Sequence, residues 1–367
     1  MQSQSLGLNE LSYKANSGMT ETNWQTNLEK QGAVYKEDAI QHYGDAASEL
    51  GATTNSNTLC DLSHLGLISL SGEDATTFLQ GQVTNDVNQL NGSNAHFSGY
   101  CSPKGRMLAL FLAFSHNEHL YLQLSKPILA PIMKRLKMYV MRSKVEINDV
   151  SNDILRFGVN GPDATDVISK ALGSRPEKDY ALVAIDHGAV IKLPSINGHS
   201  RYEVLIDAAY ALDTWNVLKT NCTPVGKPCW DWLDIQTGLP EVGVNTQEQF
   251  VPQMLNLDLL NGINFKKGCY TGQEIVARTH YLGSVKRRTY LANMTSIDTP
   301  SAGDKVVDQA ASEVGQIVKA APNLAGGFDL LIEVRIEAKQ TGNIFWNTHP
   351  VTFGTLPYLV EDEKKPE

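Results

Sequence analysis

The chain has 367 residues, of which 42% are hydrophobic and 19% are charged, a composition typical of globular proteins with two or three domains. Its 31 lysine and arginine residues face 40 aspartate and glutamate residues, and this net charge of −9 excludes a general binder of polyanions. The five cysteines include no Cys-x-x-Cys pair, which excludes a zinc ribbon, a thioredoxin motif and a self-contained cluster site, and favours free thiols in a reducing compartment.

Residues 1–57 are polar, and we expect them to form an N-terminal appendage with one or two weak helices. They contain no apolar run typical of a signal peptide. The first arginine is Arg106, whereas mitochondrial transit peptides are rich in arginine. No segment reaches the roughly 18 apolar residues of a membrane-spanning helix. We therefore expect no membrane partner and a location in the cytoplasm of a bacterium.

Two α+β units are expected next, over residues 58–150 and 151–283. In the first unit, hydrophobic periodicity predicts strands at 66–70, 106–114 and 120–124, and helices over 75–79 and 128–140. In the second unit it predicts strands at 154–160, within 180–193 and at 202–206, and helices over 164–172, 208–219 and 230–238. A Gly-x-Asp-Ala sequence joins strand to helix in both units, beginning at Gly72 and at Gly161. This repetition indicates either two related units or shared helix-capping chemistry.

The pattern changes after Arg287 to short strand-like runs separated by turns. Strands are predicted at 289–294, 315–319, 330–336 and 344–346. Residues 284–358 therefore read as a small all-β domain. The charged end, 359–367, is predicted to be a disordered tail.

The most informative stretch is Lys266-Lys267-Gly268-Cys269-Tyr270-Thr271-Gly272-Gln273-Glu274, which places one thiol after two lysines and just before a predicted helix start. Cationic neighbours and a helix N-terminus both favour a thiolate. Free cysteine is also a common small hydrophobe of tight, buried turns. A functional thiol and a buried packing residue are both consistent with this pattern.

Two windows are basic within the acidic chain, 126–145 and 264–288, and together they hold 12 of the 31 basic residues. They either line a groove for an anionic partner, such as RNA or a glutamylated cofactor, or form a solvated helix face and a charged strand edge. The anion-binding candidates are Lys104, Arg106, Arg142, Lys144 and Arg278.

Further candidates have a structural alternative. Trp230 and Trp232 are two positions apart in a predicted helix, so they cannot share one face, and one of them is free to line a cleft. Asn85 and Asp86, in the polar run 80–87, either bind a ligand or cap and turn the chain. The sequence shows no catalytic triad, phosphate-binding glycine loop or metal-binding histidine spacing.

The signature stretch 266–274 resembles that of the YgfZ family of folate-binding proteins. Three further segments agree with this family in the same order: 71–82, 101–107 and 250–264. The resemblance runs from about residue 60 to 290 and more weakly to 358. It implies a fold like that of the glycine-cleavage T-protein, an α+β ring of domains around a central folate cavity with a small C-terminal β-barrel.

The resemblance also implies a function and partners. The cofactor would be tetrahydrofolate or a derivative. The role would be that of an accessory factor for iron–sulfur cluster assembly or repair, which supports tRNA modification indirectly. The partners would be iron–sulfur assembly or client proteins, with tRNA as a further candidate.

Individual site residues follow from the same resemblance. Cys269 matches the family cysteine and would be the functional thiol, and Trp230 falls where the family has a folate-contacting tryptophan. Leu65 stands where some members have a second tryptophan. Gln236 stands where some relatives have a glutamate that bonds the pterin amine. With Asn85 and Asp86, these residues are the cofactor-binding candidates.

One departure argues against transferase chemistry. The T-protein has a pair of acidic residues in a stretch that corresponds here to Gly105-Arg106-Met107-Leu108-Ala109. Leucine and alanine cannot transfer protons or stabilise a cationic amine. The alternatives that stay open are a folate-dependent one-carbon transferase or demethylase, and a tRNA-binding module.

Overall fold

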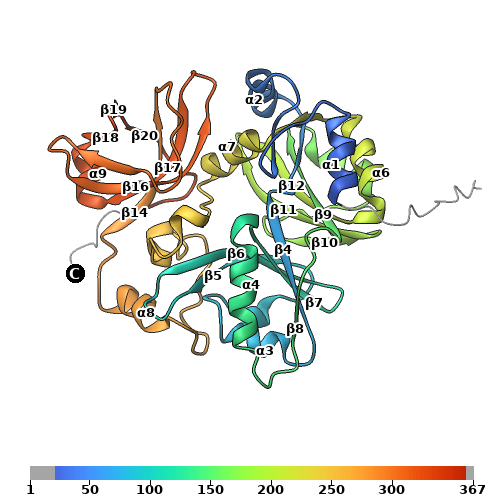
Figure 1. Ribbon diagram of the computed structural model, residues 1–367, viewed down its shortest axis with the longest axis horizontal. Coiled ribbons are helices and arrows are strands. Elements are labelled where there is room, and N and C mark those ends of the chain that lie inside the picture. Colours follow the sequence, from blue (N-terminus) through green and yellow to red (C-terminus); the bar gives the residue numbers. More distant parts are fainter. Residues whose placement is uncertain (1–20, 361–367) are drawn as a thin grey trace, which may run out of the picture.

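Three large sheets and a two-stranded ribbon organise residues 21–360, the part of the chain that the computed structural model describes. Figure 1 shows the sheets as three lobes, with α7 (Lys227–Thr237) and the following segment between them. Helices and sheets are mixed in the first two lobes, and the third is almost entirely β. This confirms the predicted α+β class. The predicted disordered tail lies, from residue 361 onward, outside the described residues.

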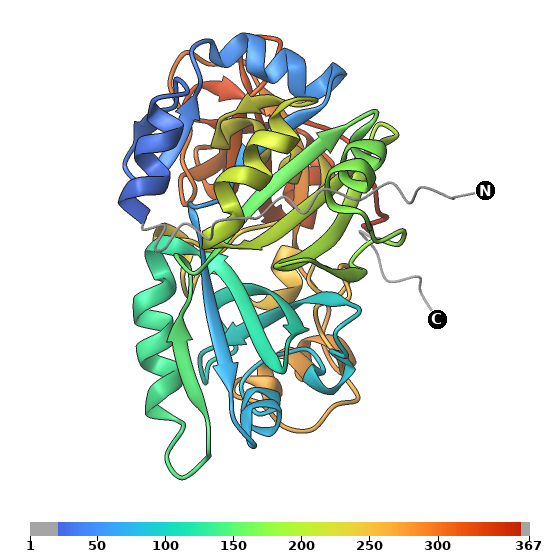
Figure 2. The same cartoon turned by 90° about the vertical axis from the view of Figure 1, so that its right-hand side faces the viewer.

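The five-stranded sheet forms one lobe, with strand order β5-β6-β7-β4-β8. Its strands are β5 (Ala95–Cys101), β6 (Met107–His116), β7 (His119–Ser125), β4 (Leu65–Ser71) and β8 (Glu146–Asp149). Two helices, α3 (Ala75–Gln80) and α4 (Leu129–Met138), pack their apolar residues on the outer face. Figure 2 shows α4 lying along this sheet. Because side chains alternate along a strand, Leu110 and Leu112 of β6 face the opposite way, toward the other lobes.

The six-stranded sheet has the order β10-β11-β12-β9-β3-β13. Its strands are β10 (Leu182–Ile185), β11 (Gly188–Ile196), β12 (His199–Asp207), β9 (Ile154–Gly161), β3 (Thr58–Asp61) and β13 (Thr223–Val225). Helices α5 (Ala164–Leu172) and α6 (Ala208–Lys219) cover its outer face. The sequence grouped residues 58–61 with the first unit, but β3 pairs with β9. The sequence pattern that predicts a strand does not reveal which other strand it pairs with.

Part of the polar N-terminal stretch belongs to this core. Helix α1 (Glu21–Glu29) inserts Trp24, whose ring stacks on Phe157 at 5.3 Å and donates from Nε1 to Asp61. Trp24 is 2% exposed. The ribbon β1 (Val34–Lys36) and β2 (Ala39–His42) and helix α2 (Ala46–Asn55) follow. Residues 21–57 are thus integrated into the fold, which their composition did not indicate.

The repeated Gly-x-Asp-Ala turn occupies the same structural position twice. A glycine with positive φ stands directly after β4, Gly72 with φ +106°, and at the end of β9, Gly161 with φ +150°, before α3 and α5 begin. A Cβ atom on either glycine would lie 2.3 Å from a neighbouring oxygen. The two strand–turn–helix units expected from the sequence are confirmed, and both turns require glycine.

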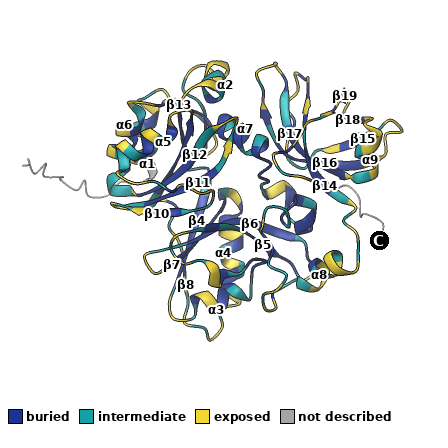
Figure 3. Cartoon of the chain, turned by 180° about the vertical axis from the view of Figure 1, so that it is seen from behind, coloured by how far each residue is buried: buried dark blue, intermediate teal, exposed yellow. Residues whose placement is uncertain are grey.

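The third lobe is a barrel-like seven-stranded sheet, as the sequence pattern predicted. Its strands are β14 (Arg287–Met294), β15 (Lys305–Asp308), β16 (Glu313–Pro322), β17 (Phe328–Arg335), β18 (Ile344–Trp346), β19 (His349–Pro350) and β20 (Thr352–Phe353), and α9 (Ile336–Thr341) follows β17. Ile317, Ile332 and Trp346 belong to its apolar interior. Figure 3 shows the buried residues following the sheets and the exposed residues on the outer helices.

The remaining elements are short. They are the 3-10 turns at Val87–Gln89, Lys126–Ile128, Val244–Thr246 and Pro252–Leu255, and helix α8 (Gln273–Tyr281). Among residues 21–360, no helix is both long and apolar enough to cross a membrane.

Candidate functional site

A central cavity lies where the three lobes meet, and it encloses about 570 Å³, including its opening to solvent. Every lobe contributes to its wall. The five-stranded sheet provides Leu65, Phe97, Leu110, Leu112, Gln123, Leu124 and Ser125; the six-stranded sheet, α7 and the segment after it provide Leu193, Glu203, Trp230, Asp234, Leu239, Pro240 and Glu241; and the barrel provides Lys319.

Two polar side chains in this wall have free acceptor atoms. Gln123 Nε2 donates to Glu203 Oε2 at 3.1 Å, whereas Glu203 Oε1 and Gln123 Oε1 have no hydrogen-bond partner among the described residues. Both residues are buried, with Glu203 only 2% exposed. Burial raises the pKa of Glu203 to about 7. Because unpartnered buried acceptors are costly, this pair is suited to a ligand that presents N–H donors.

Trp230 forms an apolar wall of the cavity. Its ring packs over Gly158 of β9, where an added Cβ atom would lie 2.3 Å from the ring. The Arg201 guanidinium lies 4.4 Å from the ring centroid, a cation–π contact that fixes the ring further. The structure therefore brings Trp230 and Leu65, two of the sequence-predicted residues, into one cavity.

Trp232 and Gln236 lie on another side of α7. Trp232 Nε1 and Gln236 Nε2 both donate to Asp329 Oδ2 of β17, at 2.9 and 2.6 Å. The two tryptophans thus serve different faces of the helix, as their spacing predicted. The prediction that Gln236 binds the cofactor needs correction, because its amide joins α7 to the barrel and it is not among the cavity-lining residues.

Sequence reasoning missed Glu203 and Gln123. The available signal was the alternation in β12, where Arg201 and Glu203 occupy alternate positions of the strand and so share one face. That face points inward, because the opposite one packs against α5 and α6.

A buried charge network joins the barrel to the rim of the cavity. Lys319 Nζ of β16 lies 3.0 Å from Asp231, 2.8 Å from Asp234 and 3.4 Å from Glu241. Arg201 also pairs with Asp234, and Lys227 pairs with Asp231, so three cations balance three carboxylates. Burial alone would lower the pKa of Lys319, but these carboxylates raise it.

The signature loop lies outside this cavity and is anchored by Lys267. Its ammonium group donates to the backbone oxygens of Gln80, Val83 and Asn85, at 2.7, 2.6 and 2.8 Å. Burial lowers the pKa of Lys267 to about 8, and Asp86 opposes that effect. Lys267 thus clamps the signature loop to the chain that follows α3.

Asn85 and Asp86 support this clamp and do not line the central cavity. The Asn85 amide donates to the backbone oxygens of Phe97 and Asn261, and the Asp86 carboxylate caps the 3-10 turn at Val87–Gln89. Of the two roles that the sequence left open for them, the structure shows capping and turning the chain.

Two glycines bring the signature loop against the hairpin turn at 101–107. Gly272 has φ +83°, and an added Cβ atom would lie 2.5 Å from the Ser102 carbonyl oxygen. Gly105 has φ +67°, and its Cβ atom would lie 2.8 Å from Ile275. Gln253 Nε2 adds a bond to the backbone oxygen of Val276. The four sequence segments that carry the family resemblance therefore meet in space around this loop.

Cys269 is exposed, whereas Cys60, Cys101, Cys222 and Cys229 are buried. The packing role that the sequence allowed for Cys269 is therefore wrong. Burial raises the pKa of Cys101, Cys222 and Cys229 to about 12, which suits inert thiols. Within the described chain, no three His, Cys, Asp or Glu side chains gather to hold a metal ion, so Cys269 offers a single ligand.

The rest of the signature stretch is divided between the turn and the start of α8. Tyr270 is buried, and the Lys267 ammonium lies 5.2 Å from its ring centroid. Lys266, Gly268 and Glu274 are exposed, and Thr271 and Gln273 are half-buried.

The anion-binding candidates do not form one site. Lys104 and Arg106 line a groove together with Arg135. Lys144 instead pairs with Glu73 at the surface, at 2.7 Å. Arg142 and Arg278 are exposed, and neither lines this groove.

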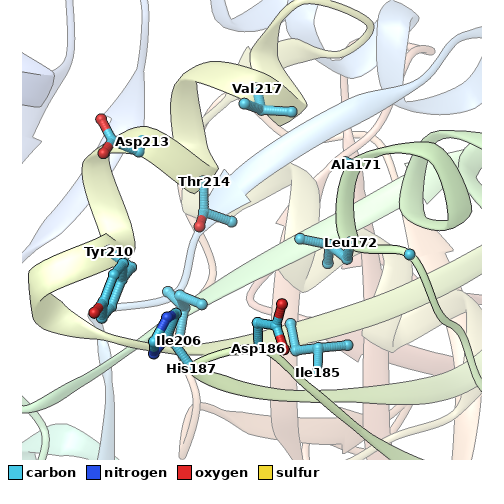
Figure 4. A pocket seen from close by; sticks show the side chains of 11 residues that line it. Ala171, Leu172, Ile185, Asp186, His187, Ile206, Tyr210, Asp213, Thr214 and Val217 are labelled. Carbon is cyan, nitrogen blue, oxygen red and sulfur yellow. The ribbon is translucent and has the colours of Figure 1, made fainter. Parts of the chain in front are cut away.

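Another groove, on the outer face of the six-stranded sheet, contains none of the predicted site residues (Figure 4). His187 stacks on Tyr210 at 3.5 Å, and Asp186 and Asp213 make the groove acidic. No buried polar side-chain atom of its described lining lacks a partner. The described lining of this groove therefore has no unpartnered buried polar atom that a ligand would satisfy.

We expect Lys267→Met to lower the free energy of unfolding by on the order of 2–3 kcal/mol, because it leaves three backbone oxygens without their charged donor. The adjacent Lys266→Met, which changes an exposed side chain, should change it by less than about 0.5 kcal/mol. Urea unfolding of both variants measures this difference. Equal losses in the two variants would contradict the clamp.

Comparison with known proteins agrees with this architecture. Residues 30–266 match the family described as the GCVT N-terminal domain. The chain is 34% identical over 256 residues to the tRNA-modifying protein YgfZ of Colwellia psychrerythraea, which covers 70% of this chain and 77% of that protein. It is 30% identical over 322 residues to the protein of the same name from Photorhabdus laumondii, covering 86% and 96%.

Among solved structures, the glycine cleavage system aminomethyltransferase T of Bartonella henselae superposes with a TM-score of 0.77. That match covers 92% of this chain and 96% of the other at 16% sequence identity, and it shows the T-protein fold. With the family match over residues 30–266 and relatives above 30% identity, the chain belongs to the YgfZ family, within the group of proteins that carry a GCVT N-terminal domain.

Proposed function

We propose that this protein is a folate-binding accessory factor for iron–sulfur cluster assembly or repair, and that it supports tRNA modification indirectly. The observation that carries the folate part is the pair of free acceptors, Glu203 Oε1 and Gln123 Oε1, inside the central cavity of a T-protein fold.

The cavity suits the pterin ring of tetrahydrofolate. The pyrimidine half of that ring is flat and presents neighbouring N–H and NH₂ donors on one edge, which match the acceptors of Glu203 and Gln123. Apolar side chains, with Trp230 among them, provide faces for the ring. The residues present therefore fit tetrahydrofolate, which supplies a carrier for one-carbon groups when bound.

The same wall argues for binding rather than aminomethyl transfer. Leu110 and Leu112 are the cavity-lining residues of β6. Leu108 and Ala109, at the positions where the T-protein resemblance expects acids, are buried in the core on the other side of the sheet. Because neither residue that β6 contributes to the cavity can transfer a proton, the folate serves recognition or regulation.

Cys269 is the residue through which we connect the protein to iron–sulfur chemistry. It is exposed, lies outside the cavity lining and offers one thiolate ligand, whereas a stable cluster usually takes four protein ligands. A second protein would supply the others, so the cluster is cargo at a shared surface. The relatives named tRNA-modifying proteins support the link to tRNA modification, since cluster-dependent enzymes would be the clients.

Anaerobic calorimetric titration with tetrahydrofolate tests the folate part. Saturable binding is expected, and Glu203→Gln should weaken it by about tenfold to a hundredfold, because a charged acceptor facing two donors becomes a mixed donor and acceptor. Gln236→Ala is the matched control and should bind like the unaltered protein, since Gln236 bonds Asp329 outside the cavity. Absence of binding to the unaltered protein would refute the proposal.

The pH dependence adds a second readout of the same contact. The pKa of Glu203 is raised to about 7, so lowering the pH through 7 protonates its carboxylate. One oxygen that would accept a hydrogen bond from the ligand then becomes a donor. We expect affinity to fall by about tenfold from pH 8 to pH 6, and to stay level over this range in Glu203→Gln. The same slope in both proteins would assign the titration to another group.

A further inference from the structure

A second concave site lies beside the signature loop, at the turn between β5 and β6. Ser102, Pro103, Lys104, Arg106, Arg135, Glu248 and Gln249 line it. It encloses about 870 Å³ with its open side and shares no lining residue with the central cavity. Gly105, within the same turn, lies against the signature loop through the Gly272 contact described above.

Two buried donors in this groove are unsatisfied. Ser102 is 4% exposed, and its hydroxyl has no hydrogen-bond partner in the described part of the chain. The Nε atom of Arg135 is likewise buried without a partner, although the Arg135 side chain bonds the Tyr100 hydroxyl. An arginine can only donate, and a serine hydroxyl is free to donate, so both call for an acceptor.

The charge of the groove points to an anion. Lys104, Arg106 and Arg135 face a single carboxylate, Glu248, which leaves two net positive charges. Arg106 is held in place by a 2.7 Å bond from Nη1 to the Gln249 backbone oxygen. A dianion with several acceptor oxygens matches both the charge and the unsatisfied donors.

We propose that this groove binds a phosphate group through Lys104, Arg106, Arg135 and the Ser102 hydroxyl. The group belongs either to an RNA backbone or to a small phosphorylated molecule. In both cases its carrier lies next to the turn on which the signature loop packs. The site does not depend on the folate proposal, because the two cavities have no residue in common.

Titration with inorganic phosphate, followed by ³¹P NMR, tests the site directly. We expect saturable binding that weakens at least tenfold in the double variant Lys104→Gln/Arg106→Gln. Ser102→Ala should also weaken it, with no change of charge. The matched control is Lys134→Gln/Lys137→Gln, which removes the same charge from exposed positions of α4 outside the groove and should bind phosphate normally.

A filter-binding titration with a tRNA transcript separates the two carriers. If the phosphate belongs to RNA, the groove variant loses tRNA affinity, the control does not, and inorganic phosphate competes. If it belongs to a small molecule, phosphate still binds in the groove while the two double variants bind tRNA equally. The proposal is overturned if inorganic phosphate does not bind, or if both double variants lose phosphate binding equally. It is also overturned if tri-γ-glutamate, a competitor that carries only carboxylates, displaces the bound phosphate more strongly than pyrophosphate does.

Discussion

Replacing Lys319 by methionine is expected to lower the free energy of unfolding by about 3–5 kcal/mol. Lys319 is 8% exposed, and its ammonium group lies within 3.4 Å of Asp231, Asp234 and Glu241. Its removal leaves the buried Asp231 and the half-buried Asp234 and Glu241 with only Arg201 and Lys227 to balance them. Buried charge without a partner is among the most costly defects a fold can carry.

A control on the same barrel separates this effect from loss of any lysine. Lys305 pairs with Glu313 at 3.0 Å, but both side chains are about half exposed. Lys305→Met should therefore cost less than about 1 kcal/mol. Urea unfolding of the two variants at pH 7 measures the difference. Similar losses would show that the buried network does not hold the barrel against α7.

Lowering the pH gives a further check on the network. In the unaltered protein, burial acts to raise the pKa of Asp231, but Lys227 and Lys319 hold it well below its usual range. Without Lys319 that pKa rises, so Asp231 protonates more readily as the pH falls and the unpaired charge is relieved. The deficit of Lys319→Met should accordingly shrink toward acidic pH.

Cys269→Ser is expected to abolish the ability of the protein to restore cluster-dependent tRNA modification in a strain that lacks its gene. Serine keeps the size of the side chain, but a hydroxyl is a poor ligand for iron and cannot exchange disulfides. Mass spectrometry of the thiolated nucleosides in tRNA measures the restoration. Full restoration by the variant would contradict an essential thiol.

The folding and ligand affinity of this variant provide the control. Cys269 is exposed, so the free energy of unfolding should change by less than about 0.5 kcal/mol. Cys269 is also absent from the cavity lining, so tetrahydrofolate affinity should be unchanged. A variant that folds and binds tetrahydrofolate but fails in the cell would place the defect at the surface around the thiol.

Strongly periodic elements were predictable because their own residues encode them. Helix α6 (Ala208–Lys219) has the bounds expected from the sequence, and α5 and the strands β4, β6 and β7 lie where their apolar patterns place them. Strand β5 was not predicted, and α1 was expected only within a polar appendage of one or two weak helices, without bounds. The apolar side of α1 consists mainly of Trp24 and Leu28, and β5 contains glycine, serine and histidine, so both depend on partners distant in the chain.

For the candidate site, the family resemblance selected Trp230 and Leu65, which line the cavity, and the sequence allowed a functional thiol or a buried packing residue at Cys269, which is exposed. Gln236 was assigned to the cavity because it stands where some relatives have a glutamate, but in the structure its amide donates to Asp329 of the barrel. Glu203 was missed because its role depends on which face of β12 points inward.

The sequence by itself determined the class of fold, the repeated glycine turns and the family, because periodicity, backbone conformation and contiguous motifs are local properties of the chain. Only the tertiary structure decided that Glu203 and Gln123 share a cavity, that Lys267 clamps a loop while Cys269 stays exposed, and that Lys104 and Arg106 join Arg135 in one groove. These residues are far apart in the chain, and the packing of three sheets around a common centre brings them together. Burial then gives their charges and free hydrogen-bonding atoms an energetic weight that they lack in solvent.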